Sequence, residues 1–148
     1  MKNKHRCNCA ITCSLDVLGD KWMLVIVKQM LIEGKKTFKD FIESDEAIAT
    51  NILATKLKLL NKLGIVTKSK FLTNRKSFYY HLTEKGLSLT PIIVELAIWG
   101  DENLRESNPN IISRSEEFMQ MKSDKVEFTK ILIENYKNMQ TETINAIS

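Results

Sequence analysis

The sequence predicts a mainly α-helical fold that carries one small antiparallel β-hairpin, and three observations support this prediction. Between residues 49 and 63, apolar side chains recur at the i, i+4, i+7 spacing of an α-helix. Gly64 follows, which suits the left-handed position that ends a helix. Residues 65–71 and 78–82 are rich in β-branched and aromatic side chains, as half-buried strands are.

Three short helices are expected before residue 49, because the apolar runs there either end at glycine or follow a capping residue. They are predicted at residues 11–18, 22–33 and 37–43. Gly19 and Gly34 would close the first two helices. Thr37 would cap the third, and Asp40, three residues further on, would complete a weak capping box.

The helix at residues 49–63, the two strands and the helix after them follow one another in the order of a winged helix. One broad side of the first helix is apolar and would pack inward, so its other side would face outward. Ala49 cannot cap this helix with its side chain. Thr50, or the acids Asp45 and Glu46, are therefore expected to satisfy the free amides and balance the positive dipole end.

The C-terminal third of the chain reads as further helices. Thr83 is expected to cap a long helix through about Trp99, in which Pro91 either kinks the helix or interrupts its hydrogen bonding. Residues 107–110 break the pattern, and apolar side chains between residues 118 and 144 predict one or two more helices. The chain thus divides into a basic N-terminal tail, a winged helix-turn-helix domain and a C-terminal helical extension, at residues 1–8, 9–107 and 108–148.

Positive charge is concentrated in the predicted winged helix. Residues 47–85 hold eight basic side chains and one acid, Glu84, which gives this segment a net charge of +7. The rest of the chain, with 14 basic and 17 acidic residues, has a net charge of −3. Because charge confined to one supersecondary unit is typical of a polyanion-binding face, the sequence predicts double-stranded DNA as a partner.

The outward side of the helix at residues 49–63 suits insertion into a major groove, because small polar residues near its start are followed by lysines. Arg75 at the hairpin tip would reach an adjacent minor groove. The predicted DNA-binding residues are Thr50, Asn51, Ala54, Thr55, Lys58, Lys62, Asn74, Arg75 and Lys76. A winged helix can instead be a protein-interaction module, but that module does not require a lysine-bearing helix beside a cationic tip.

Length and composition favour a single cytoplasmic domain without catalytic chemistry. The chain has 148 residues, 43% of them hydrophobic, and no apolar run approaches the roughly 20 residues that span a membrane. The five glycines are explained by helix ends and the junction after the hairpin, so no glycine-rich phosphate loop remains. His81 is expected to be a satisfied structural side chain, and Asp16 and Asp20 to lie on solvated helix faces. No enzyme activity, catalytic residue or cofactor is predicted.

Three cysteines, Cys7, Cys9 and Cys13, lie close together near the N-terminus. Their odd number argues against a structural disulfide framework in a cytosolic chain. Basic side chains at positions 4–6 would stabilise a thiolate and raise its reactivity. A metal site formed with His5 is an alternative, although the spacing is poor for zinc, and the cysteines can also be reduced side chains without a signalling role.

Several of these segments resemble one family of bacterial regulators. The matching residues are Cys9 and segments 15–22, 36–38, 48–60, 63–66, 80–86 and 96–100. They include a Gly-x-Lys-Trp landmark at Gly19 and a Leu-Thr-x-x-Gly landmark at Leu82, in order and at family-like spacing. On these residues the chain resembles the HxlR family of winged helix-turn-helix transcription regulators, from about Cys9 to Asn108.

The resemblance implies more than the fold. It implies a homodimer that pairs through terminal helices and, as a repressor, reads a pseudo-palindromic operator. The extension at residues 108–148 is expected to serve in dimerisation, although its apolar stripe could instead fold back on its own domain. The resemblance also implies that Cys9 senses electrophiles or oxidants, with a small electrophile as the inducer. A metal-responsive regulator without thiol sensing remains the alternative.

Overall fold

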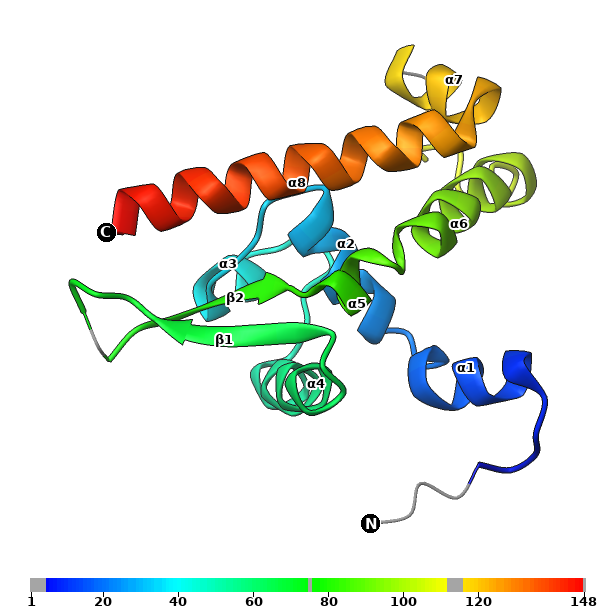
Figure 1. Ribbon diagram of the computed structural model, residues 1–148. Coiled ribbons are helices and arrows are strands. Elements are labelled where there is room, and N and C mark those ends of the chain that lie inside the picture. Colours follow the sequence, from blue (N-terminus) through cyan, green and yellow to red (C-terminus); the bar gives the residue numbers. More distant parts are fainter. Residues whose placement is uncertain (1–4, 75, 112–115, 148) are drawn as a thin grey trace.

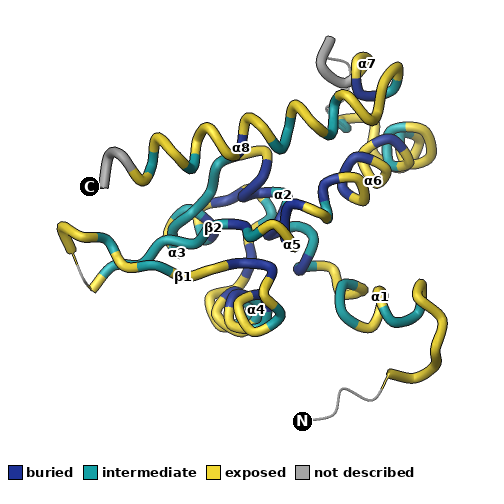
Figure 2. Tube along the Cα trace, in the orientation of Figure 1, coloured by how far each residue is buried: buried dark blue, intermediate teal, exposed yellow. Residues whose placement is uncertain are grey.

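The computed structural model describes residues 5–74, 76–111 and 116–147, and of residues 116–118 and 145–147 it describes the backbone. Figure 1 shows a small winged-helix unit with a long C-terminal helix laid across one side. Helix α2 (Met23–Leu31) lies at the centre and is buried in Figure 2. Met23, Ile26 and Met30 on this helix are each 0% exposed. Burial on several sides explains why its sequence is a nearly continuous apolar run.

The two predicted helices on either side of α2 are present as α1 (Ala10–Leu18) and α3 (Phe38–Ile42). The predicted capping box is confirmed, because Thr37 Oγ1 accepts a hydrogen bond from the Asp40 amide and the Asp40 carboxylate accepts one from the Thr37 amide. Asp20 is exposed, as expected, but its carboxylate also stabilises the start of α2. Its Oδ1 accepts hydrogen bonds of 2.8 Å from the amides of Trp22 and Met23, where α2 begins.

The winged helix consists of α4 (Thr50–Lys62), β1 (Val66–Lys70) and β2 (Phe78–Leu82). The strands are antiparallel, with Val66 opposite Leu82 and Lys70 opposite Phe78. Gly64 has a φ of 74°, so it occupies the left-handed position predicted between α4 and β1.

The outer edge of β2 is also paired. The Tyr80 amide donates to the Lys36 carbonyl at 2.7 Å, and the Leu82 amide donates to the Tyr136 hydroxyl at 2.6 Å. Residues far away in the sequence therefore cover the edge that β1 leaves open.

The helix expected over residues 83–99 is two helices, α5 (Glu84–Leu87) and α6 (Thr90–Asn103). Thr83 caps α5 by accepting a hydrogen bond from the Gly86 amide. Pro91 lies in the first turn of α6, where its missing amide costs no intrahelical hydrogen bond. The sequence predicted either a kink or an interruption at Pro91, and the structure shows an interruption of the helix between α5 and α6. The proline starts a new helix.

The C-terminal extension forms α7 (Glu116–Ser123) and α8 (Lys125–Ile147). Helix α8 contacts α2, α6 and α7, and Figure 1 shows it crossing the unit on the side opposite α4. Tyr136 is 6% exposed and belongs to the main core together with the α2 side chains. A smaller cluster joins Val94 and Ile98 of α6 to Met121 of α7. The extension thus folds back on its own domain. No helix in the described ranges is long and apolar enough to cross a membrane.

Candidate nucleic-acid interface

Helix α4 presents a polar face to solvent. Leu53, Leu57 and Leu60 are buried in the core. The opposite side is exposed and carries Thr50, Asn51, Ala54, Thr55, Lys58, Asn61 and Lys62. The structure therefore places the six predicted α4 residues on one accessible surface. The Thr55 hydroxyl donates to the Asn51 carbonyl at 2.9 Å, so its oxygen is left to act as an acceptor.

The start of α4 is not capped in the way that the sequence suggested. Ala49 is the N-cap residue and makes no side-chain capping hydrogen bond, and no acid lies in the first turn. Glu46 instead pairs with Lys28 and accepts a hydrogen bond from Gln29 at 2.8 Å. The expectation that Asp45 or Glu46 balances this helix end is therefore wrong for Glu46, because α2 occupies its carboxylate. The free amides and the dipole favour an anion at this exposed end.

The strands of the wing hold lysines over aromatic rings. Lys68 Nζ lies 4.0 Å from the ring centroid of Phe78 and 6.0 Å from that of Tyr80. Lys70 Nζ lies 5.7 Å from the Phe78 centroid. Both lysines remain exposed. These cation–π contacts restrict the side chains while leaving their charge accessible.

The side chain of Asn74 stabilises the turn at the tip of the wing. Its Oδ1 accepts a hydrogen bond from the Lys76 amide at 3.1 Å, and its Nδ2 donates to the Ser77 hydroxyl at 3.0 Å. This local bonding gives Asn74 a turn-forming role in addition to the predicted contact with DNA. Lys76 is exposed beside it. Arg75, the other predicted contact at the tip, lies outside the described residues.

A groove of about 850 Å³ runs between α4, the start of α3 and the wing. Its lining includes Lys58 from α4, Lys68 and Lys76 from the wing, and Lys39 from α3. Ala54 leaves room at its floor, and Phe78 forms part of an apolar wall. Of the predicted DNA-binding residues, Ala54, Lys58 and Lys76 line this groove, while Thr50, Asn51, Thr55, Lys62 and Asn74 are exposed outside its lining. Lys39, Lys68 and Lys70 were not among the predicted site residues. Lys39 and Lys68 line the groove because α3 and the wing lie beside α4 in space, and Lys70 lies on the same strand as Lys68 outside the lining.

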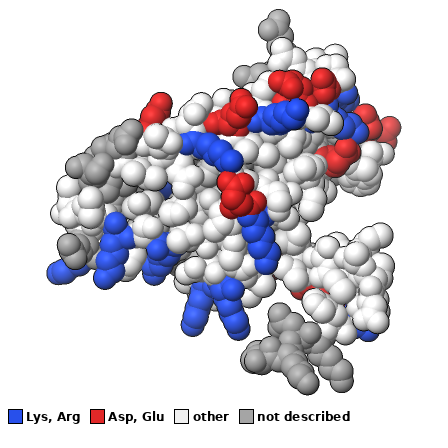
Figure 3. All heavy atoms as spheres, viewed as in Figure 1, with Lys and Arg blue, Asp and Glu red and all other residues white. Residues whose placement is uncertain are grey.

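Acids are nearly absent from this surface. In the part of the chain that the structure describes, Lys58, Lys62, Lys68, Lys70 and Lys76 form no ion pair. Lys39 pairs with Glu43 at 3.8 Å on an exposed helix turn. Lys56, by contrast, pairs with Asp20, and Lys85 donates to the Leu63 carbonyl at 2.7 Å. Figure 3 shows Lys and Arg side chains along the lower edge, over α4 and the wing, with acids gathered on the opposite side.

Residues 17–108 match the family model of the HxlR-like helix-turn-helix. The chain belongs to the HxlR family. It is 34% identical over 95 residues to the uncharacterized HTH-type transcriptional regulator YybR of Bacillus subtilis, across 64% of this chain and 75% of YybR. It is 32% identical over 89 residues to the HTH-type transcriptional regulator YodB of the same organism, across 60% of this chain and 79% of YodB.

Solved structures of other HxlR-type regulators have the same fold. The oxidised form of the redox regulator HypR superposes with a TM-score of 0.57 at 33% identity, covering 64% of this chain and 97% of HypR. Quinone-bound YodB from B. subtilis gives a TM-score of 0.53 at 29% identity, covering 64% of this chain and 99% of YodB. This HxlR protein is accordingly a winged-helix transcription regulator, and about a third of its chain extends beyond the matched region.

The three cysteines of this HxlR protein form no disulfide in the structure. Cys7 and Cys9 are exposed, and Cys13 is half-buried. Cys9 is the N-cap residue of α1. A thiolate there would accept hydrogen bonds from the amide and hydroxyl of Thr12, which lowers the pKa of Cys9. The described residues hold no group of three or more His, Cys, Asp or Glu side chains that could share a metal ion.

Large apolar side chains are exposed on two helices of the HxlR domain. Helix α1 has no buried residue, and its Ile11 and Leu15 are 72% and 57% exposed. On α6, Leu96 and Trp99 are 52% and 57% exposed. Figure 1 shows both helices at the end of the molecule farthest from the wing tip. Apolar side chains are exposed on the C-terminal extension as well, among them Val126 at 68% and Ile144 at 48%, so its predicted role in dimerisation stays a prediction.

Proposed function

We propose that this protein binds double-stranded DNA in a sequence-specific manner and acts as a homodimeric repressor. The observation that carries the proposal is the concave surface of α4 and the wing. Five exposed lysines on these elements have no carboxylate partner among the described residues. Exposed ammonium groups around a helix of major-groove size suit a phosphate backbone on either side of that groove.

The residues on this surface divide into two roles. Asn51 and Thr55, with Thr50 and Ala54 beside them, would meet base edges, because they are short and lie near the exposed start of α4. Lysines at positions 58, 62 and 76, with Asn74 and Arg75 at the wing tip, would meet phosphates and the adjacent minor groove. Lys39, Lys68 and Lys70 extend the phosphate-binding set.

The test is selection of duplexes from a random pool, followed by affinity measurements at several salt concentrations. The logarithm of affinity should fall with the logarithm of salt concentration, and Lys58→Ala should reduce that slope by about 0.9. Asn51→Ala should weaken preference among sequences by about 1–3 kcal/mol at the contacted base pair. Lys130→Ala, an exposed lysine of α8 away from the surface, is the matched control. Salt-independent affinity, or equal effects of all three substitutions, would contradict the proposal.

The proposed dimer uses α1 and α6. Both helices expose apolar side chains that a two-fold partner would cover, whereas α8 packs on its own domain through Tyr136. Such a dimer would hold two copies of α4 about 34 to 36 Å apart, to read a pseudo-palindromic site.

Sedimentation at micromolar concentration tests the proposed dimer. The protein should sediment as a dimer, and Leu96→Asp should shift it toward the monomer, whereas Ile131→Asp on the exposed side of α8 should not. A monomer for the unchanged protein would refute the dimer, and a shift caused only by Ile131→Asp would move the interface to α8.

We also propose that Cys9 responds to electrophiles. Its exposure and lowered pKa favour the nucleophilic thiolate, and quinone-bound YodB is a structural relative. Treatment with benzoquinone should modify Cys9 first and lower DNA affinity in the unchanged protein but not in Cys9→Ser. Cys13→Ser, which alters a half-buried thiol of the same helix, is the control. Equal loss of affinity in Cys9→Ser would exclude this role.

A further inference from the structure

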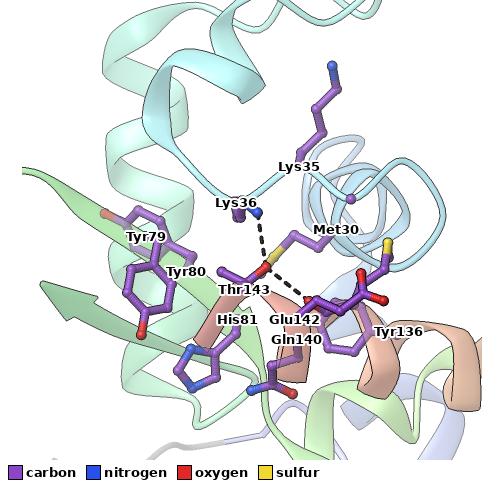
Figure 4. A pocket seen from close by; sticks show the side chains of 12 residues that line it. Met30, Lys35, Lys36, Tyr79, Tyr80, His81, Tyr136, Gln140, Glu142 and Thr143 are labelled. Carbon is purple, nitrogen blue, oxygen red and sulfur yellow. Dashed lines mark hydrogen bonds between the residues drawn. The ribbon is translucent and has the colours of Figure 1, made fainter. Parts of the chain in front are cut away.

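A second cavity lies on the other side of β2 from the DNA-binding surface. It has a volume of about 330 Å³ and is enclosed by β2, the loop after α2 and the C-terminal half of α8 (Figure 4). Its lining includes Met30, Lys36, Tyr79, His81, Tyr136 and Thr143. The residues of α8 belong to the extension beyond the HxlR match at residues 17–108, so this part of the site is not supplied by the matched domain.

The walls of this cavity are aromatic and sulfur-rich. The rings of Tyr79 and His81 lie 5.9 Å apart with an angle of 37° between their planes. Tyr136, whose hydroxyl is fixed by the Leu82 amide, adds a third ring, and the side chains of Met30 and Met139 complete the apolar part. Aromatic faces and thioethers favour contact with a flat aromatic ring. A volume near 300 Å³ is at the lower end for small-molecule sites and suits one or two fused rings.

Two lysines line this cavity, Lys35 and Lys36, and no ion pair joins either of them to a described residue. Lys36 is half-buried, and its Nζ donates to the Thr143 hydroxyl at 3.0 Å, as Figure 4 shows. It forms no ion pair with any described residue. Glu142 is the acid among the lining residues, but its side chain is exposed and makes no ion pair with Lys36. A half-buried ammonium group held only by a hydroxyl is placed to bind a carboxylate more strongly than water-exposed lysines do.

The His81 ring differs from the sequence-based expectation of a satisfied side chain. Its Nδ1 is buried and has no hydrogen-bond partner among the described residues. Burial lowers the pKa of His81, so the imidazole is neutral at pH 7 and adds no second charge to the cavity. Figure 4 shows the Lys35 side chain pointing away from the cavity, whereas the Lys36 ammonium group lies at Thr143, so Lys36 is the cation with which a bound acid would interact directly.

We propose that this cavity binds a small aromatic carboxylate, with its ring among Tyr79, His81 and Tyr136 and its carboxylate on Lys36. The ligand would contact β2 and α8 together. It would therefore occupy a site separate from both the DNA-binding surface and Cys9.

Calorimetry and NMR of the full chain with 2-naphthoate test the proposal without DNA, so the result is independent of the proposed DNA binding. For a ligand of this size, the expected Kd is about 1 mM or lower. The uncharged analogue 2-naphthamide should bind about ten-fold more weakly. Among the two histidines of the chain, the imidazole signals of His81 should shift, and those of His5, far along the N-terminal tail, should not.

Two substitutions locate the site. Lys36→Met should lower naphthoate affinity about ten-fold, to the level of the amide, whereas Lys130→Met should leave it unchanged. Met139→Trp, at a position 37% exposed, should fill the cavity and abolish binding of both compounds even if Lys36→Met does not fold. Absence of naphthoate binding, equal affinity for the amide, equal shifts at His5 and His81, or unchanged binding to Met139→Trp would overturn the proposal.

Discussion

Replacing Tyr136 with phenylalanine tests whether the C-terminal extension is part of the folded domain. The change removes one oxygen atom and keeps the ring, which is 6% exposed and packed in the main core. The lost hydroxyl is the acceptor of the Leu82 amide at 2.6 Å, on the outer edge of β2. The Leu82 side chain is itself 2% exposed, so water has little access to that amide.

The expected loss of stability comes from the Leu82 amide, which stays buried in Tyr136→Phe without its acceptor. A buried donor left without its acceptor costs about 1–3 kcal/mol of unfolding free energy, more than the net contribution of an ordinary hydrogen bond. For a chain of this length, that loss lowers Tm by roughly 3 to 10 °C. Burial raises the pKa of Tyr136, so its hydroxyl stays protonated throughout the neutral range and the comparison is not complicated by ionisation.

Urea and thermal unfolding of the unchanged protein, Tyr136→Phe and Tyr79→Phe measure the difference. Tyr79 is the matched control, because it is half-buried on the same strand and no hydrogen bond of its hydroxyl is present in the described structure. Tyr79→Phe should change the free energy of unfolding by less than about 0.5 kcal/mol. If both tyrosine variants were equally stable, the extension would contribute no buried hydrogen bond to the wing, and the reasoning would fail.

Three further predictions concern local stability. Thr37→Ala should cost about 1 kcal/mol, because it removes the acceptor of the Asp40 amide in the capping box, and urea unfolding would show it. Gly64→Ala should cost about 1–2 kcal/mol by the same measurement, because an L-residue is strained at a φ of 74°. His81→Gln should reduce the loss of stability between pH 7 and pH 5. The pKa of His81 is lowered in the folded state, so acid protonates the unfolded chain first and stability falls as the pH drops below about 6.5. An identical pH dependence in both proteins would contradict this.

The winged helix was predictable from the sequence, because each of its elements has a strong local signal. Apolar spacing defined the buried side of α4, and Gly64 defined its end. Thr37 and Asp40 defined the start of α3. Such signals depend only on neighbours within a few residues. The predicted site residues of α4 are exposed together for the same reason.

Contacts between distant residues were not predictable in this way. Nothing local indicates that Glu46 turns to Lys28, that Asp20 pairs with Lys56, or that Tyr136 reaches β2. The covering of the apolar stripe of α8 depends on the same long-range geometry. Pro91 shows a related limit, because one residue is compatible with a kink inside a helix and with the first turn of another.

The limited burial of α1 has a consequence for how Cys9 behaves. A helix of nine residues that buries none of them gains little from tertiary packing, and such a short segment is marginally helical in water. In the proposed dimer its helical state would depend on the second subunit, so dilution should melt it before the rest of the domain. The amides that acidify Cys9 are organised only while α1 is helical. If the proposed dimer forms through α1, the chemical reactivity of this thiol should therefore depend on protein concentration.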